Sequence, residues 1–352
     1  MGKIKLAVVF GGMSTEHDVS IVSGMSVIKN LNKEKYEIYP LYIDEGGNWY
    51  KYTKNVNEVE IPKVGDKVDS IEELDNPIKY LKNMDCVFPV LHGLYGEDGT
   101  IQGLFELIKV PYVGCKVLAS SISMDKSYTK VIFEKAGLNQ ANYVYIRENK
   151  GKYIYVDKDF TETVYTLEEL ADRIDKQQKY PMFVKPSNSG SSVGINKAKT
   201  KEELKNAIEY AAKFDKKILV EEGINGREVE CAVLGNEDVI AACVGEILSA
   251  EEFYSFDSKY NNSQSLTVIP ANLPKEISEE IRKQAVKAFK AVNGSGLSRV
   301  DFFVERDTNR IIINEINTMP GFTTISMYPK LFEGIGIEYA DLLDKIIELA
   351  IK

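Results

Sequence analysis

Apolar residues near the start of the chain follow the pattern of a strand, a glycine turn, a helix and a second strand. Residues 4–10 form an apolar run that ends at Gly11 and Gly12. Helical spacing of apolar residues follows from Val19 to Leu31, and the strand-like run YEIYPLYI comes next. A parallel α/β domain begins in this order. We therefore predict an α/β fold for the N-terminal part.

The later pattern divides the chain into three predicted domains. MDCVFPVLHG adds a strand to the first domain, and DGTIQGLFELIKVPYVG adds a helix and a further strand. A helix near SISMDKSYTK opens a second segment that contains the strand YPMFVKP, and the remaining strands and helices indicate an α+β C-terminal part. We predict domains at 1–124, 125–222 and 223–352, with a long polar loop at 249–265.

Two carboxylates interrupt the apolar hairpin GLSRVDFFVERDTNRIIINEIN. If its turn is centred on Thr308, Asp301 lies opposite Glu315, and Arg299 lies opposite Asn317. Both carboxylates then share one face, and Mg²⁺ is commonly held by a few such oxygens while phosphate completes its shell. We predict that Asp301, Glu315 and Asn317 bind Mg²⁺. A register slip of one residue would separate the carboxylates, and a solvated polar face is the simpler interpretation of an isolated hairpin.

Two further segments carry candidate nucleotide-binding residues. FVKPSNSGSSVGI ends a strand at Lys185 and continues in small residues whose backbone N–H groups can approach a phosphate. Walker A spacing is absent, and a surface turn is the alternative. VEEGINGREVE carries Glu221, Glu222 and Glu228, which could accept hydrogen bonds from adenine or ribose, although glutamates beside a strand are usually only solvated.

Composition narrows the class of protein. The 44 basic and 53 acidic residues give a net charge of -9, which argues against general nucleic-acid binding. Four cysteines without CxxC spacing and two histidines disfavour a zinc site and a disulfide framework. No run approaches the roughly 20 apolar residues of a membrane span, and the start lacks the apolar stretch of a signal peptide. We expect a soluble cytoplasmic protein that acts on small molecules.

Eight segments in chain order resemble the D-alanine:D-alanine ligases of the ATP-grasp superfamily: GGMSTEHDVS, FPVLHGLYGEDGTIQG, MDKSYTK, VKPSNSGSSVG, VEEGINGREVE, FDSKYN, SRVDFF and NEINTMPGFT. The resemblance implies an ATP-grasp fold, in which two domains sandwich ATP behind an N-terminal parallel-sheet domain. It also implies that ATP activates D-alanine as an acylphosphate, which the amine of a second D-alanine attacks. The product, D-alanyl-D-alanine, would serve peptidoglycan synthesis and cell wall biogenesis.

The resemblance assigns nine residues to ATP: Lys126, Lys185, Ser191, Glu221, Glu222, Ile224, Glu228, Asn314 and Glu315. Lys126 and Lys185 would contact the phosphates, Glu221 the adenine and Glu228 the ribose. The metal set given above would hold two Mg²⁺ ions bridged by Glu315, and Mn²⁺ can substitute.

It also assigns the residues that meet D-alanine. The catalytic set is Glu16, Ser191, Tyr260, Arg299, Gly321 and Ser326, and the substrate-binding set is Glu16, His92, Lys259, Arg299 and Ser326. Glu16 would hold the ammonium of the first D-alanine, close to His92. Arg299 and the N–H of Gly321 would stabilise the oxyanion. Ser326 with Lys259 would bind the carboxylate of the second D-alanine.

The loop at 249–265 would close over the reactants. By resemblance, Ser191 and Tyr260 form a hydrogen-bond network with Glu16, and closure would keep water from the acylphosphate. Each assignment has a simpler counterpart: Glu16 could cap the helix that follows it, and His92 could be an ordinary residue at a strand end. The resemblance also suggests a homodimer formed largely by the first domain.

Three competing functions stay open on the sequence. D-serine as second substrate differs from D-alanine by one hydroxyl, which pockets distinguish only modestly. D-lactate is disfavoured, since the pair Lys259–Tyr260 resembles that of the amine-using enzymes. A ligase for a different carboxylate is the second possibility. An inactive ATP-binding regulatory protein is the third, although such a protein would have no need for the polar set around Arg299 and Asp301.

Overall fold

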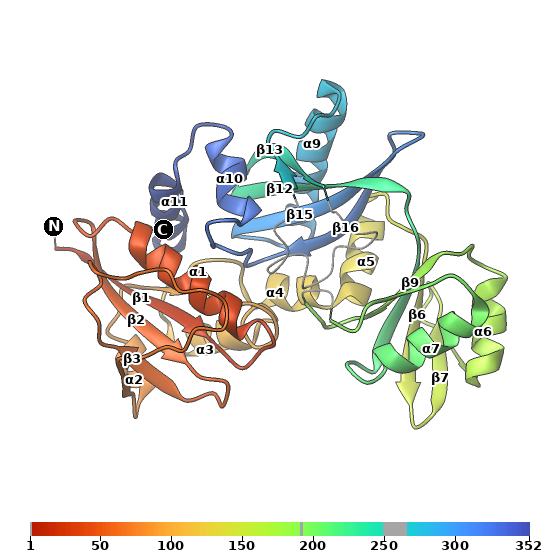
Figure 1. The fold of residues 1–352 in the computed structure, drawn as a ribbon, viewed down its shortest axis with the longest axis horizontal. Coiled ribbons are helices and arrows are strands. Elements are labelled where there is room, and N and C mark those ends of the chain that lie inside the picture. Colours follow the sequence, from red (N-terminus) through yellow and green to blue (C-terminus); the bar gives the residue numbers. More distant parts are fainter. Residues whose placement is uncertain (1, 191–192, 249–265) are drawn as a thin grey trace.

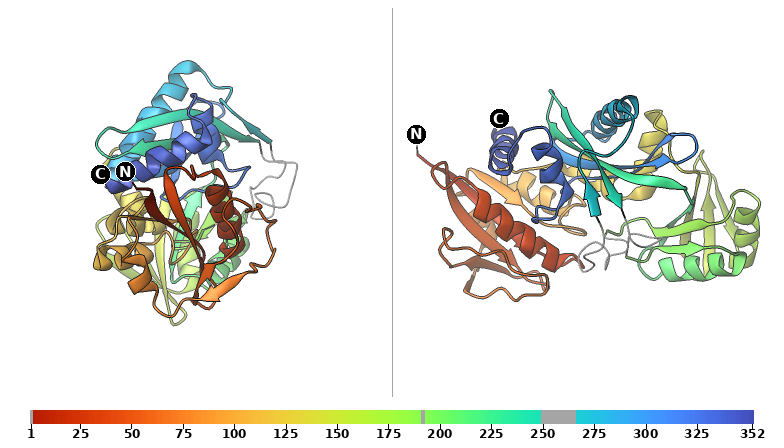
Figure 2. Two further views of the ribbon diagram at one scale, coloured as in Figure 1. Left: turned by 90° about the vertical axis from the view of Figure 1, so that its left-hand side faces the viewer. Right: turned by 45° about the horizontal axis from the view of Figure 1, so that its top comes forward.

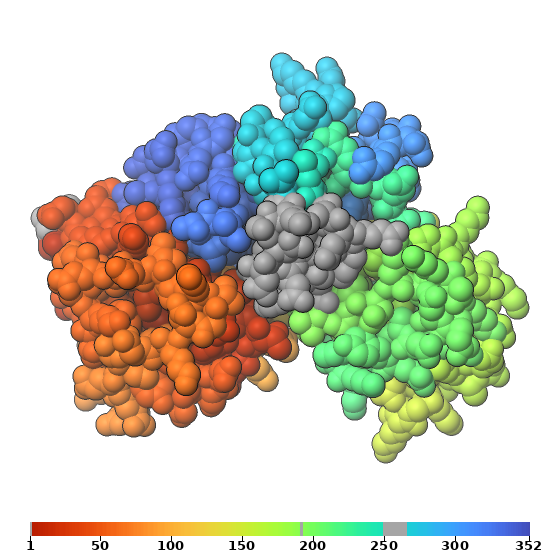
Figure 3. All heavy atoms as spheres, viewed as in Figure 1, coloured from red at the N-terminus to blue at the C-terminus, as the bar shows by residue number. Residues whose placement is uncertain are grey.

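The computed structural model describes residues 2–190, 193–248 and 266–352, and it holds three sheets that follow one another along the chain. Figure 1 shows the first sheet and the second sheet at opposite ends of the molecule, with the third sheet between and above them. The same arrangement gives the two outer lobes of the space-filling view in Figure 3. The predicted mixture of α and β structure is confirmed.

The first sheet has the order β4-β3-β2-β1-β5, and its strand β1 lies between β2 and β5 and runs parallel to both. Alternate residues of β1 enter different cores, because side chains alternate across a strand: Leu6 and Val8 lie in one, Ala7 and Val9 in the other. The strands are β1 (Ile4–Gly11), β2 (Tyr36–Ile43), β3 (Trp49–Tyr52), β4 (Ile71–Glu73) and β5 (Cys86–Pro89); the helices are α1 (His17–Asn30), α2 (Pro77–Leu81), α3 (Thr100–Ile108) and α4 (Val117–Met124).

The second sheet has the order β10-β9-β11-β6-β7-β8, and its neighbouring strands pair antiparallel. One face packs against the apolar sides of α6 and α7, which gives this region its own core. The elements are β6 (Tyr143–Asn149), β7 (Lys152–Val156), β8 (Glu162–Tyr165), α6 (Leu167–Asp175), β9 (Met182–Pro186), β10 (Asn196–Ala198), α7 (Lys201–Ala211) and β11 (Lys217–Glu222).

The third sheet has the order β14-β13-β12-β15-β16, and its two faces differ in chemistry. Val300, Phe302 and Val304 of β15 pack in an apolar core with α9, whereas Arg299 and Asp301 point to the opposite face. The elements are β12 (Gly226–Gly235), β13 (Ile240–Leu248), β14 (Leu266–Val268), α9 (Lys275–Ala291), β15 (Gly296–Glu305), β16 (Ile311–Asn317), α10 (Met327–Glu333) and α11 (Tyr339–Ile351).

The hairpin β15–β16 has the predicted pairs, but its turn is not where we predicted it and a bulge corrects the register. Val304 pairs with Ile311, so the turn is not centred on Thr308, and a bulge at Asn314 shifts the register. The bulge adds one residue to β16, which restores Asp301 opposite Glu315, and Arg299 lies opposite Asn317. The two carboxylates are therefore cross-strand neighbours, as predicted.

Two helices, α5 and α11, pack against a sheet that is distant from them in the chain. Leu342 and Ile346 of α11 belong to the same core as Leu6 of β1, and both chain ends lie on that side of the molecule (Figures 1 and 2). Helix α5 (Lys126–Lys135) lies in the segment predicted for the central domain, yet its Phe133 packs in the core of the third sheet with Ile313. The boundaries at 124 and 222 stay predictions.

Candidate active site

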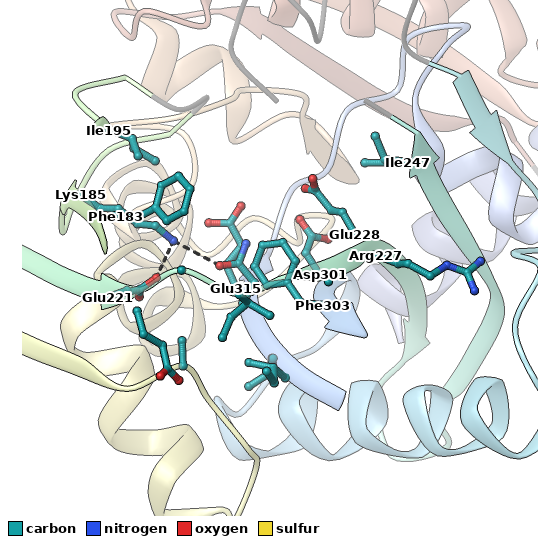
Figure 4. A pocket seen from close by; sticks show the side chains of 18 of the residues that line it. Phe183, Lys185, Ile195, Glu221, Arg227, Glu228, Ile247, Asp301, Phe303 and Glu315 are labelled. Atoms are coloured by element: carbon teal, nitrogen blue, oxygen red, sulfur yellow. Dashed lines mark hydrogen bonds and ion pairs between the residues drawn. The ribbon is translucent and has the colours of Figure 1, made fainter. Parts of the chain in front are cut away.

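A cavity of about 610 Å³ lies between the second and third sheets (Figure 4). Strands β9 and β11 form one wall, strands β12, β13, β15 and β16 form the other, and α5 contributes two lysines, Lys126 and Lys130. Its volume is in the range of small-molecule and cofactor sites. Eight of the nine predicted ATP-binding residues lie along it: Lys126, Lys185, Glu221, Glu222, Ile224, Glu228, Asn314 and Glu315.

Glu221 lies between two lysines at the end of β11. Its Oε1 is 2.9 Å from Lys130 Nζ, and its Oε2 is 2.7 Å from Lys185 Nζ. Burial alone would raise the pKa of Glu221, but the two lysines lower it to about 2. Lys185 also donates to Asn314 Oδ1 at 3.3 Å (Figure 4). The carboxylate of Glu221 thus fixes both lysines at the cavity wall, and its predicted contact with adenine stays a prediction.

Lys126 stands at the first position of α5 and reaches the cavity from there. Its Nζ donates to Ser189 O at 2.8 Å and lies 3.4 Å from Glu315 Oε2. Asp125 caps this helix, and its side chain accepts hydrogen bonds from the N–H of Ser127 and from the Ser187 hydroxyl at 3.1 and 2.6 Å. Lys126 is therefore held against the serine-rich loop that follows β9.

Arg299 and Asp301 form a two-fold hydrogen-bonded pair on the cavity face of β15. Arg299 Nε donates to Asp301 Oδ1 and Nη2 to Oδ2, both at 2.7 Å, and Glu230 lies 3.0 Å from Nε. Burial would lower the pKa of Arg299, but Asp301 and Glu230 keep it well above its usual value. Arg299 is thus a fixed positive charge beside the predicted metal ligands.

The three predicted metal ligands supply only part of the oxygen shell that Mg²⁺ requires. Asp301 and Glu315 are opposite each other, and Asn317 Oδ1 accepts from the N–H of Met319 at 3.0 Å. Among the residues that the structure describes, no group of three or more His, Cys, Asp or Glu side chains could hold a metal ion. Two carboxylates and one amide fit a Mg²⁺ that arrives with nucleotide, because phosphate and water oxygens complete its shell.

Glu16 lies where the first sheet meets the cavity region. A Cβ on Gly93 would stand 2.7 Å from Glu16 Oε2, and a Cβ on Gly190 only 2.5 Å from the same oxygen. Glycine at both positions lets two loops approach the carboxylate closely. The loop after β5 and the serine-rich loop are thus brought together at Glu16, which lies at the start of α1 and makes no side-chain cap there.

His92 is buried, and both of its ring nitrogens have partners. Nδ1 lies 3.1 Å from Met319 O, and Nε2 lies 3.0 Å from Ser23 Oγ. The carboxylate of Glu97, 3.8 Å from Nδ1, raises the pKa of His92 against the effect of burial. His92 thus belongs to a buried hydrogen-bond network, and its predicted place beside the first substrate stays a prediction.

The turn after β16 carries the last two predicted residues. A Cβ on Gly321 would lie 2.7 Å from Ser326 Oγ, so the two residues are neighbours. Ser326 Oγ accepts from the N–H of Thr323 at 3.0 Å. Three other predicted residues, Ser191, Lys259 and Tyr260, lie outside the described residues, as does the loop at 249–265.

Two family models match the chain. One, described as D-ala D-ala ligase N-terminus, matches residues 5–115, and the other, described as D-ala D-ala ligase C-terminus, matches residues 132–348. The chain belongs to the D-alanine–D-alanine ligase family. The predicted family is thereby confirmed, and with it a ligase with the ATP-grasp architecture.

Relatives within this family match over nearly the full length. A protein of Acetivibrio thermocellus named D-alanine--D-alanine ligase is 50% identical, and the match covers 99% of this chain and 96% of the relative. One of Clostridium acetobutylicum with the same name is 47% identical, with 99% and 98% covered.

Solved structures of the family have the same fold. The VanG D-Ala:D-Ser ligase from Enterococcus faecalis has a TM-score of 0.84 at 37% identity, with 99% of this chain and 100% of that chain covered. The D-alanine-D-alanine ligase from Coxiella burnetii has a TM-score of 0.81 at 34% identity, with 100% and 94% covered.

Sequence patterns missed several residues of the site. Lys130 and Glu230 complete the charge networks around Glu221 and Arg299, and Glu97 lies beside His92. Lys130 lies four residues after Lys126 on one helix face, which is a usable signal. Glu230 gives none, because its partner Arg299 is distant in the chain. Glu97 is only five residues from His92, but the segment between them is neither helix nor strand and has no regular spacing.

Proposed function

We propose that this chain joins two D-alanine molecules into D-alanyl-D-alanine with conversion of ATP to ADP and phosphate. One observation carries the proposal: Lys126, Lys185, Arg299, Asp301 and Glu315 line one nucleotide-sized cavity, with Lys126 in contact with Glu315. The family names of the relatives supply the substrate class.

The chemistry has two steps. A carboxylate oxygen of the first D-alanine attacks the γ-phosphorus of ATP, the bond to the β-phosphate oxygen breaks, and ADP leaves. The amine of the second D-alanine then attacks the acyl carbon, loses a proton and expels inorganic phosphate. Both steps place negative charge between the nucleotide and the amino acids, where positive groups and N–H donors are most effective.

Residues of the chain divide this work by position. Lys126 and Lys185 hold the phosphates, and Glu16 holds the ammonium of the first D-alanine close to His92. Arg299 and the N–H of Gly321 stabilise the oxyanion. A bound Mg²⁺, or Mn²⁺ in its place, would neutralise phosphate charge beside Asp301, Glu315 and Asn317.

The remaining assignments complete the same proposal. Glu222, Ile224 and Glu228 border the nucleotide base and sugar, with Glu228 at the ribose, and Asn314 orients Lys185. Ser326 and Lys259 bind the carboxylate of the second D-alanine. Ser191 and Tyr260 join Glu16 in the network that closes the loop at 249–265.

We also propose a homodimer in the cytoplasm. The first region exposes apolar side chains on α3 and α4 that a second copy would cover, including Leu107 at 83% and Leu118 at 57% exposed. Within the described residues, none of the helices is long and apolar enough to cross a membrane. Sedimentation should give twice the mass of 39.6 kDa, and Leu107→Lys should return the monomer.

D-serine is the competing second substrate, because one of the similar structures is named a D-Ala:D-Ser ligase. The test supplies ATP, Mg²⁺ and an equal mixture of D-alanine and D-serine, and mass spectrometry identifies the dipeptides. We expect mainly D-alanyl-D-alanine. A majority of D-alanyl-D-serine would reassign the substrate, and absence of ADP with folded protein would refute the ligase.

Two variants anchor the metal assignment in the same assay. Glu315→Gln should abolish ADP formation and weaken Mg²⁺-dependent ATP binding while the fold is kept. Glu305→Gln is the matched control, since Glu305 stands on the same hairpin but does not line the cavity. Near-normal turnover of Glu315→Gln would remove Glu315 from the metal site.

A further inference from the structure

The turn that carries Gly321 is held on both sides by hydrogen bonds from distant elements. Ser23 Oγ of α1 accepts from the N–H of Phe322 at 3.2 Å. The carbonyl of Met319 lies 3.1 Å from His92 Nδ1, and Tyr339 OH of α11 donates to Phe322 O at 2.8 Å. Gly321 therefore stands inside a short segment whose two ends are both fixed.

The hydrogen positions in this network follow from the chemistry of its members. A carbonyl oxygen only accepts, so His92 Nδ1 carries the hydrogen toward Met319 O. Nε2 and the Ser23 hydroxyl lie 3.0 Å apart: Ser23 donates to Nε2 in the neutral ring, and Ser23 accepts from Nε2 in the protonated ring. The Ser23 oxygen keeps a lone pair for the N–H of Phe322. All three groups are satisfied at once.

Ser23 connects His92 to Phe322, and packing holds it in place. Its side chain is fully buried, and the ring of Phe322 is fixed by an edge contact with Phe88 at 5.5 Å between centroids. Ser23 lies on α1, the helix that begins beside Glu16. One rigid helix thus links the site proposed for the first substrate ammonium to the turn of Gly321.

We propose that Ser23 is a positioning residue that aims the N–H of Gly321 at the reacting carboxylate. Ser23 touches no substrate and acts through Phe322 and His92. The proposal rests on the proposed ligase function, since it assigns a partner to the Gly321 donor. A shift of the turn by even 1 Å would weaken the oxyanion contact, because such contacts depend steeply on geometry.

The test compares Ser23→Ala with Ser120→Ala. Ser120 is an equally buried helical serine, and its hydroxyl donates at 3.3 Å to Cys115 O and not to a residue of the turn. We expect kcat of Ser23→Ala to fall about 10- to 100-fold, with KM for ATP within twofold of wild type. Ser120→Ala should keep kcat within twofold. A kcat for Ser23→Ala equal to that of Ser120→Ala would overturn the proposal.

A second measurement does not depend on turnover. Hydrogen exchange at the Phe322 amide should be faster in Ser23→Ala than in wild type or Ser120→Ala, and unchanged exchange would refute the role. If Ser23→Ala does not fold, Ser23→Cys takes its place, because it keeps the size of the side chain and weakens its hydrogen bonds. Ser23→Cys should lower kcat at constant KM for ATP, and an unchanged kcat would overturn the proposal. Absence of wild-type turnover would instead refute the ligase function, while the exchange data would still decide about Ser23.

Discussion

Arg299 and Asp301 stand two residues apart on β15 and bind each other through two hydrogen bonds of 2.7 Å. Both oxygens of a proposed Mg²⁺ ligand are thus already engaged by an arginine. A metal ion can share an oxygen with Arg299, since a carboxylate oxygen has a second lone pair. Glu230, 3.0 Å away, would keep Arg299 paired if Asp301 turned toward the metal.

Asp301→Asn should therefore separate catalysis from folding. We expect ADP formation to fall about 100-fold or more and the Mg²⁺ concentration for half-maximal rate to rise, because a charged ligand is lost. The melting temperature should change little, since Glu230 still pairs with Arg299. Titration of ADP formation with Mg²⁺ measures this, and Asp307→Asn in the exposed turn is the control. An unchanged Mg²⁺ requirement would count against Asp301 as a ligand.

Glu221→Gln should destabilise the protein strongly. The substitution removes the carboxylate between Lys130 and Lys185, whose side chains are only 4% and 12% exposed. Loss of one partner of a buried ion pair costs about 3–5 kcal/mol. Urea unfolding at pH 7 measures the change, with the exposed Glu209→Gln as control. A loss no greater than that of the control would show that the lysines need no carboxylate.

The lowered pKa of Glu221 also predicts how the free energy of unfolding depends on pH. Because the pKa of Glu221 is lowered from 4.5 to about 2, its contribution is complete above pH 4.5 and is lost as pH falls toward 2. Wild type should thus lose its advantage over Glu221→Gln across this range. Unfolding free energies at pH 5, 4 and 3 test the slope, and a constant difference would contradict the lowered pKa.

Glu97 should affect the pH dependence of stability in the opposite sense to Glu221, and Glu97→Gln tests this. Burial raises the pKa of Glu97 from 4.5 to about 7, although His92 opposes this shift. The native state therefore binds more protons than the unfolded state, and wild type should lose stability as pH rises from 4.5 to 7. Glu97→Gln should show a flatter profile than the exposed control Glu73→Gln. Parallel profiles of the two variants would refute the raised pKa.

Asp125→Asn should loosen ATP binding. Asp125 is buried and accepts from Ser127, Ser187 and Lys217, which joins the start of α5 to the end of β9. Its pKa is lowered by these donors against burial. We expect KM for ATP to rise about tenfold with a smaller change in kcat. A tenfold rise corresponds to about 1.4 kcal/mol of binding free energy. Steady-state kinetics measure it against Asp175→Asn, and an unchanged KM would refute the link.

The sequence determined the elements that depend on local periodicity. The strand at 4–10, the helix after Gly12 and the hairpin around Asp301 and Glu315 are where alternation and helical spacing placed them. The resemblance of ordered motifs then supplied the family, which the family models confirm. Local patterns suffice for such features because residues close in the chain set them.

Only the tertiary structure decided which distant side chains share one site. It added the bulge at Asn314 that restores the predicted pairing, it packed α5 with the third sheet, and it joined His92 to Ser23 and Met319. Such partners are separated by up to 227 positions. Whether such residues come into contact depends on how whole sheets pack. A periodic pattern indicates which face of a helix or strand is buried, but not which other element covers it.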